Sequence, residues 1–237
     1  MTRLPLRLLA LLLAAASAGC GVPVGRDFVR PTPATIDVGT ATLQQVRARY
    51  GEPRSERSWA RGDLELPKEI GTPFGAPRVP GVMAELYYYY ENRGDTAAAP
   101  GVEPSRSARY WFWNDRLVGF QSSSSFKSDS TRFDESRVAA IRPWQSLRGD
   151  LIKMFGEPSG VRVFPLVPGE DQQALTWFNF EFDTASRQSR ARTLHVLINN
   201  IGVVVDSRFD STSKPIPPPP VPAYTPVPIY IPPVKRK

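Results

Sequence analysis

Cys20 is the only cysteine of the chain, and its surroundings suggest what chemistry it undergoes. A short basic start precedes an unbroken apolar run over residues 8–16, and the small residues Ser17, Ala18 and Gly19 lead to Cys20. This order is the anatomy of a secretory signal peptide. The apolar run is shorter than the roughly 20 residues that cross a bilayer. The sequence therefore predicts secretion, with cleavage just before Cys20.

The stretch from Ala16 to Cys20 resembles the lipobox of bacterial lipoproteins, in which the cysteine receives a diacylglycerol and a further acyl chain such as palmitate. A lone cysteine in a secreted chain needs an explanation, and lipidation supplies one. Each buried methylene contributes about 0.8 kcal/mol, so several acyl chains hold a protein stably on a membrane. Position 21 is Gly and not the Asp that retains enterobacterial lipoproteins in the inner membrane. The resemblance thus implies a lipid anchor at Cys20 and the periplasmic face of the outer membrane. The alternative is an ordinary signal peptide with a cysteine near its cleavage site.

Few other residues suggest catalysis. With one histidine and an acylated cysteine, the mature chain has no set for a disulfide, a structural zinc site or a Cys/His nucleophile. His195 is interpreted as an exposed or locally bonded strand histidine. Ser122 to Ser125 has no base nearby and is interpreted as a polar edge strand that blunts sheet pairing. The carboxylates form no defensible glycosidase pair. We therefore predict no catalytic residue, no metal, no cofactor, no small-molecule substrate and no enzymatic activity.

Two aromatic segments carry the candidate binding residues. In Leu86–Glu91 and Arg109–Asn114, side chains alternate between two faces, as in a strand. One face shares its positions with charged residues and is therefore predicted to be solvated. The other face is predicted core and holds Leu86, Tyr88, Tyr90, Tyr110 and Phe112. Open patches of Tyr and Trp are common in protein interfaces. The alternative is that a loop or another part of the chain covers both faces. The candidate interface consists of Tyr87, Tyr89, Trp111 and Trp113.

An internal repeat organises the middle of the chain. Ile36–Pro53 and Ile141–Pro158 match at a constant offset of 105 residues and both end in Gly-Glu-Pro. Apolar residues at helical spacing predict one amphipathic helix in each copy. Gly51 and Gly156 are placed to end these helices in a left-handed conformation. Three strands are predicted after each helix: Leu86–Glu91, Arg109–Asn114 and Leu117–Phe126, then Ala174–Asp183, Thr193–Asn199 and Gly202–Phe209.

This order resembles the small outer-membrane-assembly lipoproteins of the SmpA/OmlA (BamE) type. The residues that carry the resemblance are Ile36, Gly39, Thr42, Val46, Gly51 and Pro53. The second copy departs from it at Pro143 and Trp144. Beta-lactamase-inhibitory proteins have tandem copies of a similar fold and bind a protein through the sheet face. The resemblance implies an α+β fold of two tandem units. Each unit would be a helical segment on a three-stranded or four-stranded antiparallel meander.

Composition divides the chain into five parts. They are a signal peptide (1–19), a flexible tether (20–35), a first repeat (36–135), a second repeat (136–213) and a disordered proline-rich basic tail (214–237). Prolines in the tail exclude a helix or central strand there. The tail could dock into an aromatic groove of a partner. The preferred interpretation is a spacer whose basic end contacts anionic surfaces.

The net charge of +7 does not indicate a nucleic-acid partner. Six basic residues lie in the signal peptide and the tail, which leaves the globular part with about +1. Nucleic-acid binding needs clustered basic residues on the domain itself.

These observations favour a non-catalytic envelope lipoprotein that binds another envelope protein in outer-membrane assembly or maintenance. The alternative is an inhibitor or sensor module that binds a periplasmic protein through its sheet face. A cell-wall hydrolase that uses carboxylates is the remote alternative.

Overall fold

The computed structural model describes residues 22–61, 70 and 72–216. The predicted signal peptide, Cys20 and residues 217–237 of the predicted tail lie outside this range. The described part contains nine strands, two α-helices and one 3-10 helix. In chain order they are β1 (Val24–Gly25), α2 (Leu43–Tyr50), β2 (Ser55–Arg61), β3 (Gly81–Glu91), β4 (Ser105–Trp113), β5 (Arg116–Ser124), η2 (Glu135–Ala140), α3 (Arg148–Phe155), β6 (Gly160–Arg162), β7 (Gln173–Asp183), β8 (Gln188–Ile198) and β9 (Val204–Pro215).

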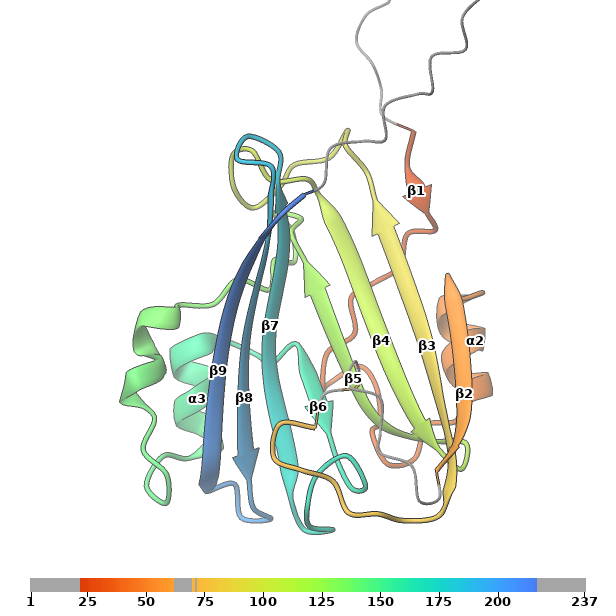
Figure 1. Cartoon of the computed structure of the whole chain (residues 1–237), viewed down its shortest axis with the longest axis vertical. Coiled ribbons are helices and arrows are strands. Elements are labelled where there is room, and N and C mark those ends of the chain that lie inside the picture. The colour runs from red at the N-terminus through yellow and green to blue at the C-terminus, as the bar shows by residue number, and fades with distance from the viewer. Residues whose placement is uncertain (1–21, 62–69, 71, 217–237) are drawn as a thin grey trace, which may run out of the picture.

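All nine strands belong to one antiparallel sheet (Figure 1). Its order is β1-β3-β4-β5-β6-β7-β8-β9, and β2 also pairs with β3. Strand β3 is long enough for two partners on its outer edge. Residues 81–87 pair with β2, and Tyr90 and Glu91 pair with β1. The six strands predicted after the helices are present, most of them longer than expected.

The predicted fold of two tandem helix-plus-meander units is wrong, because the strands form a single continuous sheet. The join is made by β5 and β6, where Phe120 pairs with Val161 and Gln121 with Gly160. A Cβ on Gly160 would lie 2.6 Å from the Phe120 carbonyl oxygen, so the close approach requires glycine. Two separate meanders would each leave edge strands with unpaired backbone groups, and the join removes two such edges.

The two short α-helices lie where the sequence predicts them, and each ends at the predicted glycine. Thr42 caps α2 by accepting a hydrogen bond from the Gln45 amide, and Gln45 returns one to Thr42. Gly51 and Gly156 follow the two helices with φ of 81° and 78°, a region that glycine enters without a Cβ penalty. A sheet residue then binds each of these glycine carbonyls. Tyr88 Oη donates to Gly51 O at 3.0 Å, and Trp177 Nε1 donates to Gly156 O at 2.9 Å.

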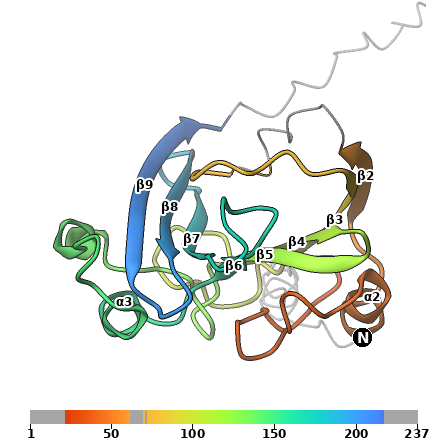
Figure 2. The ribbon, with the colours of Figure 1, turned by 90° about the horizontal axis from the view of Figure 1, so that it is seen from below.

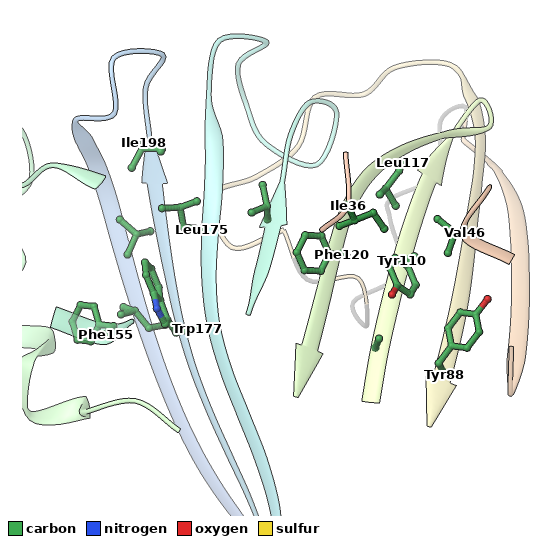
Figure 3. Packing of buried hydrophobic residues seen from close by; sticks show 14 of the residues in the cluster. Ile36, Val46, Tyr88, Tyr110, Leu117, Phe120, Phe155, Leu175, Trp177 and Ile198 are labelled. Carbon is green, nitrogen blue, oxygen red and sulfur yellow. The ribbon is translucent and has the colours of Figure 1, made fainter. Parts of the chain in front are cut away.

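The main core lies between the helices and the convex side of the sheet (Figure 2). Val46 and Tyr50 of α2 are buried there, as are Leu151 and Phe155 of α3. Figure 3 shows Phe155 beside Trp177 of β7, with ring centroids 5.5 Å apart. On the face predicted to be core, Leu86, Tyr88, Tyr110 and Phe112 are buried, and Tyr90 is partly buried against the same cluster.

The lower part of the concave side is also covered. Ile70 is only 1% exposed and packs with Met83, Trp111, Val118 and Leu166. Residues 72–80 and the β6–β7 connection cross the open side of the trough in Figure 2. The segment between the first helix and β3 thus supplies both strand β2 and part of this cover.

A seam of serine side chains runs between β5 and β7, above the three-residue strand β6. The Phe180 amide donates to Ser123 Oγ at 2.8 Å, and the Phe178 amide donates to Ser159 Oγ at 2.7 Å. Ser122 binds the Ser159 carbonyl through both its amide and its hydroxyl. Here hydroxyl groups satisfy backbone amides that have no strand partner. The interpretation of Ser122 to Ser125 as a polar edge strand is therefore wrong, because these residues are buried inside the sheet.

The predicted boundaries of the tether and the tail also change. Val24 and Gly25 form β1, and Phe28 is buried against Tyr50 and Tyr88. The chain therefore enters the fold before residue 35, and the described part of the predicted tether packs on the sheet. Residues 214 and 215 belong to β9 and not to the tail. Among the described residues, no helix has the length and apolarity needed to span a membrane.

Candidate binding groove

A groove of about 680 Å³ occupies the upper half of the concave side. It lies at the end of the sheet where β3 and β7 finish and where the described chain ends after β9 (Figure 1). Strands β3, β4 and β5 form one wall, and β7 forms the other. The groove is lined by Val24, Arg54, Tyr87, Tyr89, Glu91, Arg93, Glu103, Ser105, Ser107, Ser123, Phe180, Phe182, Thr184 and Ile216.

Tyr87 and Tyr89 provide the aromatic surface of the β3 wall. A guanidinium group lies over each ring. The Arg109 guanidinium carbon is 4.9 Å from the Tyr87 ring centroid, and that of Arg54 is 5.1 Å from the Tyr89 ring centroid. Tyr89 Oη donates a hydrogen bond to Glu91 at 2.8 Å. Burial and this bond raise the pKa of Tyr89, and burial raises that of Tyr87. Both phenols therefore remain protonated donors throughout the physiological pH range.

Paired charges form the rim of the groove. Arg93 bridges two carboxylates, with Nε 2.9 Å from Glu91 and Nη2 3.1 Å from Glu103. Exposed ion pairs of this kind contribute little to stability. The opposite charges neutralise one another, so the rim is polar without a strong net charge. The centre of the groove is aromatic.

The opposite wall comes from Phe180 and Phe182, whose rings meet edge to face with centroids 4.8 Å apart. The β3–β4 connection holds this end of β7 in place. The Glu103 amide donates to the Phe182 carbonyl at 3.0 Å, and the Thr184 amide donates to the Gly101 carbonyl at 2.8 Å. This connection therefore closes the end of the groove across the seam.

The four predicted interface residues separate into two groups. Tyr87 and Tyr89 line the groove. Trp111 is 1% exposed, and Arg162 lies over its ring at 4.7 Å. Trp113 is partly covered by Phe164, whose ring centroid lies at 6.1 Å. The structure thus contradicts the expectation that both tryptophans lie on an open face.

Glu85 explains why the charge pattern was misleading. This carboxylate is 4% exposed but accepts a hydrogen bond from Trp111 Nε1 at 2.9 Å and lies 3.8 Å from Arg109. A buried charge is tolerated when it is paired and hydrogen-bonded. Glu85 therefore sits on a covered face, although its alternation with Tyr87 and Tyr89 predicted a solvated one.

His195 lies on the concave side of β8 at the level of β6. Its Nδ1 is 3.0 Å from Thr176 Oγ1, so the locally bonded alternative is confirmed, although the side chain is only 8% exposed. Burial, and then the positive charge of Arg162, lower the pKa of His195 to about 3. Its imidazole is neutral at neutral pH and serves packing. Over residues 22–61, 70 and 72–216, no three His, Cys, Asp or Glu side chains gather as a metal site.

Sequence reasoning missed Phe180 and Phe182. The signal was present, since Phe178, Phe180 and Phe182 alternate with polar residues in the predicted strand Ala174–Asp183. Alternation of this kind indicates one shared face of a strand. The β3 and β7 walls come together only because the two halves of the chain form one sheet, and this join was not predicted.

A second apolar surface lies at the opposite end of the molecule. Trp144 is 69% exposed, and Leu147 and Ile201 are also exposed. The isolated pairing of Leu147 with Val203 brings these residues to the same region. A second pocket, lined in part by Leu147 and Ile201, lies there beside the polar residues Arg148, Glu170 and Asp171.

No family model and no curated protein sequence matches the chain. Among solved structures, the chain is similar to a Streptococcus mutans protein provisionally assigned as a beta-lactamase inhibitor protein. The two are 10% identical with a TM-score of 0.37, and the match covers 72% of this chain and 82% of the other. Beta-lactamase-inhibitory proteins are one of the two classes that the sequence resembles. The match gives no support to the other class, the BamE type. At this level of similarity it carries no argument about fold or function.

Proposed function

We propose that this chain is a non-catalytic envelope lipoprotein that binds another envelope protein through the concave groove. The observation that supports the proposal is the groove itself, with Tyr87 and Tyr89 facing Phe180 and Phe182 inside a polar rim. Protein interfaces are enriched in aromatic residues at their centre and polar at their edge. A few such anchors carry most of the binding energy.

A quantitative capture experiment tests the proposal. The full mature chain is cross-linked in native membranes, and the captured proteins are compared with those of a variant that carries Tyr87→Ala and Phe180→Ala. Loss of two aromatic anchors should reduce capture of a specific partner by tenfold or more, because each costs about 1 kcal/mol or more. Trp144→Ala is the matched control, since it removes an exposed aromatic residue outside the groove.

Equal capture by wild type and the groove variant would contradict the proposal. If the captured partner is an enzyme and its activity falls on binding, the protein acts as an inhibitor, which is the alternative predicted from the sequence.

A further inference from the structure

The groove begins where the described chain ends, and this position suggests a ligand. We propose that the proline-rich segment 217–237 of this chain docks in the groove and competes there with the partner. The inference rests on the proposed function, because it assigns a regulator to the same groove. Ile216, the last residue before the segment, is itself part of the lining, and its amide donates to the Arg187 carbonyl at 2.8 Å.

The chemistry of the groove suits a proline-rich ligand. Nine of the 21 residues in the segment are proline, which offers a carbonyl acceptor but no N–H. Proline-rich chains dock into aromatic-lined grooves, where rings pack against the pyrrolidine rings. Tyr87 and Phe180 supply such rings on opposite walls. Hydroxyl groups of Tyr87 and Ser107, for which no hydrogen bond within the described residues is found, can donate to ligand carbonyls.

The segment also has the reach. An extended chain of 21 residues at about 3.1 Å per residue spans about 65 Å. The groove wall from Tyr87 to Glu91 is about 13 Å long, at about 3.3 Å per strand residue. A ligand joined directly to the rim has an effective concentration in the millimolar range. Weak intrinsic affinity therefore suffices for high occupancy.

Charge contributes little to this recognition. The segment holds no acidic residue and ends in Lys235, Arg236 and Lys237. The rim carries Arg54 and Arg93 against Glu91 and Glu103, so it has no net charge to attract that end. If the segment binds through contacts between proline and aromatic rings, its occupancy of the groove should change little between low and high salt. If it bound through its basic end, salt would screen the attraction and lower the occupancy.

Photo-crosslinking in the full chain tests the proposal. A p-benzoylphenylalanine replaces Val221, about 15 Å along an extended chain from Ile216. Cross-links located by mass spectrometry should be intramolecular and fall on peptides that contain Tyr87, Tyr89, Phe180 or Phe182. The same reporter in place of Val234 is the matched control, and its groove cross-links should be several-fold fewer. Cross-links outside the groove, none at all or only between molecules would overturn the proposal.

Two further variants separate this proposal from the proposed function. Replacing Pro217 to Pro220 by serine should lower groove cross-linking from position 221 several-fold. A chain that ends at Ile216 keeps every described strand and should capture the partner several-fold better than the full chain. If groove cross-links are found but neither chain captures a partner, only the proposed function fails. If the groove variant loses the partner but cross-links miss the groove, only the docking of the segment fails.

Discussion

His195 shows how a polar residue contributes to this fold at the scale of a single side chain. Its ring lies between strands β7 and β9 on the concave side, bonded to Thr176 and close to Arg162. A charged imidazole there would lose hydration and face a guanidinium group. The neutral form fits the site, and this preference links protonation of His195 to folding.

The linkage predicts acid sensitivity. The ordinary pKa of 6.5 applies to the unfolded chain, while the folded pKa is about 3, so protons favour unfolding as the pH falls from 6.5 towards 3. Between pH 7 and pH 5 the free energy of unfolding should fall by about 2 kcal/mol because of this group. Urea unfolding of wild type and His195→Gln at both values measures the effect, since glutamine does not titrate. An equal loss in both proteins would rule out this role for His195.

Site residues were predicted where the alternation of side chains along one strand is enough to assign them to a face of the sheet. Tyr87 and Tyr89 were identified because their face follows from the period of a strand. Trp111 and Trp113 follow the same rule, yet Ile70 and Phe164, from segments without a periodic pattern, cover them. Whether a sheet face is open depends on where such connections cross, and alternation within a strand carries no information about that.

At the scale of elements, the serine seam is the unusual feature. Ser123 takes the place of a strand partner for Phe180, which lies across the gap in β7. Ser123→Ala leaves this amide buried without an acceptor and should cost about 1–3 kcal/mol of stability. Chemical denaturation measures the loss, and faster hydrogen exchange at Phe180 would locate it. The exposed Ser128 provides the control, and Ser128→Ala should stay within about 0.5 kcal/mol. A Ser123→Ala protein as stable as wild type would mean that water replaces the hydroxyl.

Helices and strands were predictable where the spacing of apolar residues and the glycine, proline or turn residues that end a segment indicate the same boundary. The two α-helices were found because apolar spacing ends at a Gly-Glu-Pro in each, and the strands after them because alternation ends at turn residues. Strands β1, β2 and β6 were missed. The three-residue β6 is too short for any periodic signal, and β2 lies among mixed polar residues. The union of the sheet depends on β6, so the prediction of two units failed at the element with the weakest pattern.

At the scale of the whole molecule, the proposed anchor remains a prediction from the sequence, since Cys20 lies outside the described residues. Its removal should abolish lipidation, because no second cysteine exists to accept the diacylglycerol. Wild type and Cys20→Ser are grown with a fatty-acid analogue, and label and membrane fraction are measured. We expect label and membrane retention only in wild type. A labelled Cys20→Ser protein in the membrane fraction would place the anchor elsewhere.

Along the serine seam, fewer regular backbone hydrogen bonds join the two halves of the sheet than join neighbouring strands elsewhere. Elsewhere strands are joined by regular backbone ladders, but between β5 and β7 a few hydroxyl groups and the short β6 carry the connection. This line separates Tyr87 and Tyr89 from Phe180 and Phe182. Bending along this line would change the width of the groove while each wall kept its own geometry. We therefore expect the width of the groove to adapt to a bound ligand more readily than the geometry of either wall.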